Sequence, residues 1–309
     1  MATTSTEHPY EISGAEVNVS RLSVWMRQHP IVAYFTFAFA GTWILQMPML
    51  LGRNGLGIFP YEVPETLFAI LFILGAYTGP TLSAFIVTNA LDGKEGRRKL
   101  FRRYGQWRVG LPWYLLAIFG LPLIYFIASS VALGHVPLAD LGANGITLFS
   151  TYLIMLLIFP AFLTWGEEPG WRGFALTRMQ GSYHPLLSSV IVGFMHSLWH
   201  LPVFMLVSGP IALGPFDLLS FSTNTATIIA VTILWTWVFN HARGSILIAV
   251  LLHASLNASP AWMSTLISNY PEDAAGKIVQ GFYFVAAVAL IFITNGRLGY
   301  AIDPVEKTE

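Results

Sequence analysis

The sequence predicts an all-α, polytopic helical membrane protein with about eight transmembrane helices. The first observation behind this prediction is composition: 55% of the 309 residues are hydrophobic and only 10% are charged, whereas an ordinary soluble domain has about 25% charged residues. The second is that apolar stretches of about 20 residues, the length that crosses a bilayer, recur along the chain. Both observations exclude a water-soluble enzyme and a disordered chain.

Eight stretches meet or approach the length of a membrane span. In chain order they are 31–51, 65–91, 111–133, 146–165, 185–206, 220–240, 245–267 and 279–295. The first 29 residues are polar and contain no apolar core of a signal peptide, so we expect no cleaved leader. The predicted layout is therefore an N-terminal cytoplasmic segment (1–29), a helical transmembrane domain (30–298) and a short cytoplasmic tail (299–309).

Positive charge predicts the orientation, because Lys and Arg are enriched in cytoplasmic segments. With the N-terminus inside, 14 of the 16 basic residues fall on the cytoplasmic side, and only Arg53 and Lys277 fall outside. This distribution predicts that both termini are cytoplasmic and that the number of spans is even.

A basic run at 94–108 has Phe101, Tyr104 and Trp107 interleaved with its charges. It predicts an inner anchor for the second and third spans that contacts anionic lipid. A nucleic-acid partner is not expected, because the net charge is zero and the basic residues gather in this one loop. The chain has no cysteine, which excludes disulfides, thiolate metal sites and a cysteine nucleophile.

Ionisable side chains inside membrane spans are costly and point to function. The first such group lies at the inner end of the fourth span, where Glu168 and Arg172 are four residues apart and can pair. Glu167 lies about 100° around the helix and is free of that pair, so it is a candidate general base. Pro169 and Gly170 are expected to kink the helix here. The alternative interpretation is an ordinary interfacial charge cluster.

The second group is His196 and His200 in the fifth span, which share one helix face. This spacing can bind zinc, or it can form a polar stripe of hydrogen-bonded core histidines. The HExxH pattern of zinc proteases is absent. Pro202 is expected to kink the outer part of this span.

The third group is His253 and Asn257 in the seventh span, again on one face. An imidazole and a carboxamide there can donate two hydrogen bonds to one oxygen, as an oxyanion hole requires. The alternative is hydrogen bonding between packed helices.

If the fourth helix continues through Arg178, its carboxylates move to a depth of about 15 Å, level with the histidines. The three groups then line a catalytic cavity among the fourth, fifth and seventh spans that opens to the cytoplasm. We therefore expect residues 166–179 to be embedded or re-entrant.

These three motifs, in this order, resemble the CPBP family of intramembrane proteases, which includes type II CAAX prenyl endopeptidases and relatives linked to bacteriocin immunity. The family pattern is EExxxR, an aromatic residue four positions before a histidine, and HxxxN. Here it falls on Glu167, Glu168, Arg172, His200, His253 and Asn257. The resemblance covers about residues 150–268. The sequence departs from the pattern at His196, which stands where the family has the aromatic residue.

By resemblance, Glu167 and His200 activate a water molecule for attack on a peptide carbonyl. His253 and Asn257 stabilise the oxyanion. Glu168 and Arg172 form a supporting pair that positions the first glutamate.

The cofactor is left open by the residue types. Zinc is possible, since histidines and a carboxylate with one open position suit a catalytic ion. The candidate ligands are Glu167, His196, His200 and His253. A metal-free glutamate mechanism is slightly favoured.

The implied partners are membrane lipid and a peptide or protein substrate, which the resemblance allows to be lipidated. No feature of the sequence is specific for recognition of a prenyl group. An aromatic content of 14% is ordinary for side-chain packing and for residues at the membrane interface. A similar protease acting on another membrane peptide is one alternative. A non-catalytic scaffold or immunity-type protein is another. A proton-coupled transporter is disfavoured, because the sequence shows no internal repeat.

Overall fold

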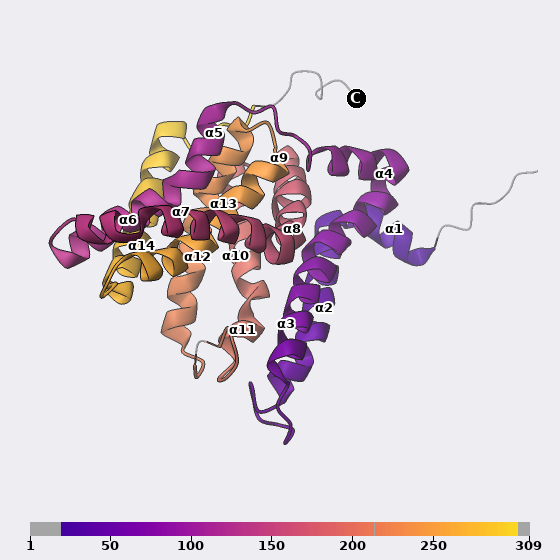
Figure 1. The fold of residues 1–309 in the computed structure, drawn as a ribbon. Coiled ribbons are helices and arrows are strands. Elements are labelled where there is room, and N and C mark those ends of the chain that lie inside the picture. The colour runs from indigo at the N-terminus through magenta and orange to yellow at the C-terminus, as the bar shows by residue number, and fades with distance from the viewer. Residues whose placement is uncertain (1–19, 213, 302–309) are drawn as a thin grey trace, which may run out of the picture.

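The computed structural model describes residues 20–212 and 214–301, and the side chains of all of these except residues 143–148. The described residues form helices and their connections, with no β-strand (Figure 1). The predicted all-α fold class is confirmed.

The helices include four segments with wider π-helical hydrogen bonding, labelled η. In chain order the elements are α1 (Arg21–Gln28), α2 (Pro30–Leu51), α3 (Glu65–Ala76), η1 (Tyr77–Thr81), α4 (Leu82–Arg102), α5 (Leu111–Leu115), η2 (Leu116–Gly120), α6 (Leu121–Leu133), α7 (Leu138–Phe159), η3 (Pro160–Thr164), α8 (Trp165–Glu168), η4 (Pro169–Leu176), α9 (Thr177–Ser182), α10 (Pro185–Trp199), α11 (Leu201–Phe204), α12 (Leu218–His241), α13 (Ile246–Leu266) and α14 (Glu272–Thr294).

Seven helical stretches of the described residues are long and apolar enough to cross a membrane. They match seven of the predicted spans, although most begin or end a few residues away from the prediction. The remaining predicted span, 185–206, is divided into the 15-residue helix α10 and the short α11, with the break at His200. Pro202 explains the break, because it lacks an N–H and disfavours helical geometry in the residue before it.

The fourth long helix runs without interruption from Leu138 to Ser182, as α7 through α9. The prediction that residues 166–179 are embedded is confirmed, since nearly all of this segment is buried within the protein. The kink expected at Pro169 is replaced by η4. Pro169 cannot donate to the carbonyl oxygen of Trp165, and that oxygen instead accepts a hydrogen bond from Thr81 Oγ1 at 3.2 Å.

Gly170 allows this helix to lie against its neighbours. A Cβ atom at this position would lie 2.5 Å from the Tyr34 hydroxyl and 2.6 Å from the backbone of Pro80. The η4 segment is therefore held directly against α2 and η1.

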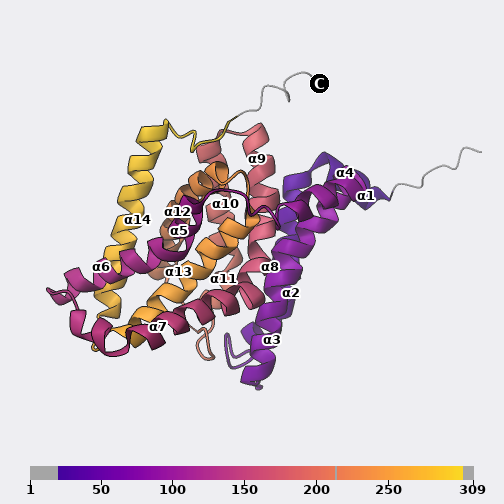
Figure 2. The same ribbon diagram turned by 45° about the horizontal axis from the view of Figure 1, so that its top comes forward.

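The helices form two groups that meet at η4 (Figures 1 and 2). On one side, α2, α3 and the first half of α4 stand together, with Tyr34 and Trp171 in one apolar cluster. On the other side, α12, α13 and α14 pack with α6 around a second cluster that contains Trp235 and Tyr283. The polar residues predicted as a site lie between these two clusters.

Candidate active site

Glu168 is the centre of one buried polar network. Its Oε1 atom accepts a hydrogen bond from Arg172 Nη1 at 2.8 Å and another from His253 Nδ1 at 2.8 Å. Glu168 is 0% exposed and Arg172 is 1% exposed. The pairing expected from the four-residue spacing is therefore present, and His253 joins it from α13.

This arrangement fixes which nitrogen of His253 carries a proton. A carboxylate only accepts hydrogen bonds, so the proton is on Nδ1. Neutral His253 then has a lone pair on Nε2, and it donates from Nε2 only as an imidazolium ion.

Glu167 belongs to a second network. Its Oε2 atom lies 3.0 Å from His196 Nε2, and both side chains are buried. The resemblance paired Glu167 with His200, but the direct hydrogen-bond partner in the structure is His196. The His196 ring also stacks on Trp171, with centroids 4.8 Å apart and planes inclined by 28°.

His200 lies beside this pair, at the break that ends α10. Its Nδ1 donates to the backbone carbonyl of His196 at 2.9 Å, which leaves a lone pair on Nε2. Ligand atoms of Glu167, His196 and His200 all lie within 4.8 Å of one another. His253, the fourth candidate ligand, is outside this group and bonded to Glu168.

The two adjacent carboxylates differ in charge compensation. Glu168 has the Arg172 guanidinium, whereas no Lys or Arg of the described residues pairs with Glu167. A buried carboxylate without a cation is costly, which makes Glu167 a candidate functional group.

Asn257 is less constrained than the other predicted residues. It lies one turn after His253 on α13 and is half-buried. Within the described part of the chain, it makes no hydrogen bond to another predicted site residue, so its role in an oxyanion hole stays a prediction.

Comparison with known proteins finds a family match over the part of the chain that contains these residues. Residues 149–259, which contain all three motifs, match the family described as "Type II CAAX prenyl endopeptidase Rce1-like". The chain is also 24% identical over 221 residues to a CAAX prenyl protease 2 of Methanococcus maripaludis, a match covering 68% of this chain and 78% of that protein. Over residues 149–259 the chain is therefore similar to the type II CAAX prenyl endopeptidases. The predicted resemblance and the predicted enzyme class, a membrane-embedded protease, are confirmed.

Two tryptophans beside these residues were not predicted as part of the site. Trp235 of α12 lies under the Arg172 guanidinium, 4.8 Å from Cζ to the ring centroid, and 5.3 Å from the His253 ring. Trp171 covers His196 from the other side. Aromatic rings packed against charged groups keep water away from them, which strengthens the electrostatic interactions between those groups. Trp171 lies inside the first motif, but nothing in the sequence separates it from a packing residue.

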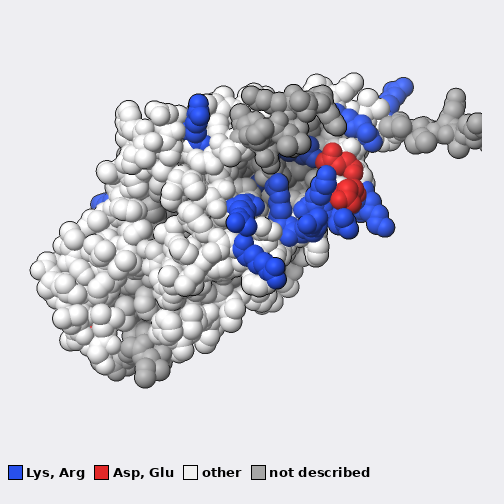
Figure 3. Space-filling model, turned by 90° about the horizontal axis from the view of Figure 1, so that it is seen from above, with Lys and Arg blue, Asp and Glu red and all other residues white. Residues whose placement is uncertain are grey.

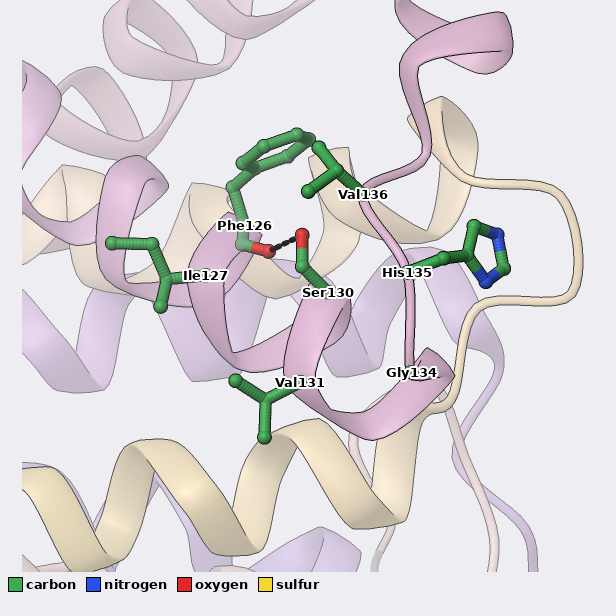
Figure 4. A pocket seen from close by; sticks show the side chains of 7 residues that line it. All are labelled: Phe126, Ile127, Ser130, Val131, Gly134, His135 and Val136. Carbon is green, nitrogen blue, oxygen red and sulfur yellow. Dashed lines mark hydrogen bonds between the residues drawn. The ribbon is translucent and has the colours of Figure 1, made fainter.

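One cavity lies away from these residues (Figure 4). It has a volume of about 490 Å³ and lies at the end of α6. Its lining residues are Phe126, Ile127, Ser130, Val131, Gly134, His135 and Val136. The Ser130 hydroxyl is already bonded to the carbonyl of Phe126, at 2.9 Å. This cavity contains no predicted site residue, and the predicted cavity among the fourth, fifth and seventh spans stays a prediction.

A second cavity of about 270 Å³ approaches the site helix. It lies between α3, the end of α7 and η3, and Pro210 and Ile211 also line it. Its lining side chains are all apolar, and one of them, Leu163, is only four residues before Glu167.

Proposed function

We propose that this protein hydrolyses a peptide bond at the membrane with a water molecule activated by Glu167. The supporting observation is that the two adjacent carboxylates have different partners. Glu168 is paired with Arg172 and accepts a hydrogen bond from His253, while Glu167 lies near two imidazoles and has no Lys or Arg partner among the described residues. A general base must be able to accept a proton, and Glu167 is the carboxylate left available for it.

In this mechanism Glu167 takes a proton from water as the oxygen attacks the peptide carbonyl. His196 holds the Glu167 carboxylate in position, and the Nε2 lone pair of His200 accepts a hydrogen bond from the same water. Protonated Glu167 then returns the proton to the leaving amine as the C–N bond breaks. Atoms and charges balance, because one water is added across the bond.

The oxyanion of the tetrahedral intermediate needs hydrogen-bond donors. His253, oriented by Glu168 through Nδ1, supplies one from Nε2 when both ring nitrogens carry a proton. The Asn257 carboxamide supplies the second when substrate is bound. Glu168 and Arg172 thus act through His253.

A metal ion would fit one set of these residues. Two imidazoles and a carboxylate are the ligand types of catalytic zinc, and Glu167, His196 and His200 are the three that converge. Zinc bound there would polarise the carbonyl or the attacking water. The residue roles above do not require it.

We infer that the substrate is a lipid-modified peptide, as the name of the Methanococcus maripaludis relative suggests for that protein. The apolar cavity beside η3 supports this, since its lining offers no hydrogen-bonding side chain and suits a hydrocarbon chain. We also propose that both termini are cytoplasmic. The support is the distribution of basic residues along the sequence, and Lys and Arg side chains gather on the face of the molecule shown in Figure 3.

The test is cleavage by protein reconstituted in liposomes. Wild type and Glu167→Gln are offered a prenylated CAAX peptide and the same peptide without the prenyl group, with and without a strong chelator. We expect wild type to cleave the prenylated peptide and Glu167→Gln to be inactive although folded. Undiminished cleavage by Glu167→Gln would refute the mechanism. Equal cleavage of both peptides would refute the lipid preference.

A further inference from the structure

We propose that the second half of α4, residues 94–102, is a binding surface for anionic lipid headgroups that is coupled to the catalytic helix. The sequence predicted a basic loop here, but residues 94–102 are helical. Gly93 makes this possible. Its backbone lies at φ 61° and ψ −147°, where the helix bends sharply and a side chain would be strained.

The bent segment is amphipathic. Its inward face carries the buried residues Gly96 and Leu100. Its outward face carries five exposed basic residues, which are Lys94, Arg97, Arg98, Lys99 and Arg102. Among these, only Arg98 has an acidic partner in the described chain, namely Glu95 at 3.1 Å. The basic side chains gather on this end of the molecule in Figure 3.

Exposed aromatic residues lie next to the basic ones. Phe101 is 64% exposed and Trp107 is 59% exposed. The Arg108 guanidinium lies over the Trp107 ring, 4.9 Å from its centroid. Basic residues together with exposed aromatic side chains are typical of the membrane interface.

The position of the segment favours lipid over an acidic protein as its binding partner. It continues directly from a membrane-spanning helix, within the single stretch Glu65–Arg102. Only a bend separates it from the bilayer-embedded part, so its charges lie close to the level of the headgroups. In Figures 1 and 2 it lies beside α1, whose Arg21 and Arg27 are also exposed.

Both ends of the segment are attached to the helix that carries the carboxylates. Before it, Asp92 forms an ion pair with Arg178 of α9. After it, Arg103 Nη1 donates to the Gly173 carbonyl at 3.2 Å and to Thr177 Oγ1 at 2.7 Å.

Thr177 continues this connection to the site. Its hydroxyl donates to the backbone carbonyl of Arg172 at 2.8 Å, and Arg172 in turn holds Glu168. Headgroups that hold the segment therefore also hold η4. We infer that anionic lipid raises the rate of cleavage, a part of the proposal that rests on the proposed function.

Lipid binding is tested without reference to catalysis. The chain has no cysteine, so Gly105→Cys beside the segment can carry an environment-sensitive fluorophore. Gly276→Cys near the start of α14 is the matched control. The full chain is placed in nanodiscs of phosphatidylcholine, alone or with one third phosphatidylglycerol.

We expect phosphatidylglycerol to shift the emission of the label at position 105 but not at 276, and high salt to abolish the shift. Combined Lys94→Gln, Arg97→Gln and Lys99→Gln substitutions are expected to remove it, whereas Arg53→Gln with Lys277→Gln leaves it intact. A shift that survives the triple substitution would overturn the proposal. So would a shift equally large in phosphatidylcholine alone, or one that an acidic peptide produces instead of the lipid.

Coupling is then measured as cleavage in the same nanodiscs. Phosphatidylglycerol is expected to stimulate wild type several-fold and to leave the triple variant at its basal rate. Asp92→Asn is expected to keep the fluorescence shift but to lose stimulation. A fluorescence shift without stimulation of an active wild type would overturn the coupling. Absence of any cleavage, with the shift intact, would count against the proposed function and not against the lipid surface.

Discussion

Replacing His196 with phenylalanine isolates the contact that holds the proposed base. The substitution removes the 3.0 Å hydrogen bond to Glu167 but keeps an aromatic ring to stack on Trp171, whose centroid lies 4.8 Å away. The CPBP pattern itself has an aromatic residue at this position, so we expect the fold to accept it.

The size of the effect follows from the kind of hydrogen bond removed. A buried hydrogen bond to a charged group contributes about 1.5–3 kcal/mol. If Glu167 loses that support in the transition state, the rate of cleavage falls about 12- to 140-fold, at about 1.4 kcal/mol for each factor of ten. Because the ring stacking is retained, the loss of stability should not exceed the contribution of that hydrogen bond, about 1.5–3 kcal/mol.

The assay is steady-state cleavage of the prenylated peptide in liposomes, with thermal unfolding measured on the same preparations. We expect His196→Phe to lower kcat more than it raises KM. His196→Gln, which keeps an N–H donor, should recover part of the rate. His135→Phe, an exposed histidine far from the site, is the control. Wild-type kcat in His196→Phe, with unchanged unfolding, would show that His196 is only a packing residue.

Three further predictions concern the fold, the substrate and the metal. Glu168→Gln leaves the Arg172 guanidinium buried without a carboxylate, so we expect a loss of about 3–5 kcal/mol of stability, measured by denaturant unfolding; unfolding like that of wild type would contradict this. Ala69→Trp fills the apolar cavity beside η3 and should raise KM for the prenylated peptide only. Ala289→Trp on α14 is the control and should leave KM unchanged. An equal rise in KM in both variants would show a nonspecific effect. We expect cleavage to continue in excess chelator; its loss, with recovery on adding zinc, would assign the ion to the converging carboxylate and imidazoles.

The membrane helices could be predicted from the sequence because each rests on local information. Composition and length alone place seven long spans. The pairing of Glu168 with Arg172 follows from helical spacing, and both residues belong to one continuous helix. The helical course of residues 94–102 was missed, because a dense run of basic residues is equally typical of a loop.

Contacts between helices could not be predicted in the same way. His196 meets Glu167 across 29 positions, and His253 meets Glu168 across 85. Helical periodicity shows which residues share a face, but it does not show towards which neighbour that face is turned. Nothing in the sequence indicated that Trp235 lies at the site, because its contact with Arg172 joins two different helices.

The rotation of one helix explains why two adjacent glutamates have different roles. Side chains of neighbouring helical residues point about 100° apart, so Glu167 is turned towards α10 and Glu168 towards α13. Glu167 therefore lies near imidazoles and, among the described residues, has no Lys or Arg partner. Glu168 contacts a histidine and is also paired with Arg172. Consequently the two glutamine substitutions should fail in different ways. Glu167→Gln should fold normally and not cleave, while Glu168→Gln should first lose stability. Identical behaviour of both variants, in unfolding and in cleavage, would mean that the carboxylates act as one unit.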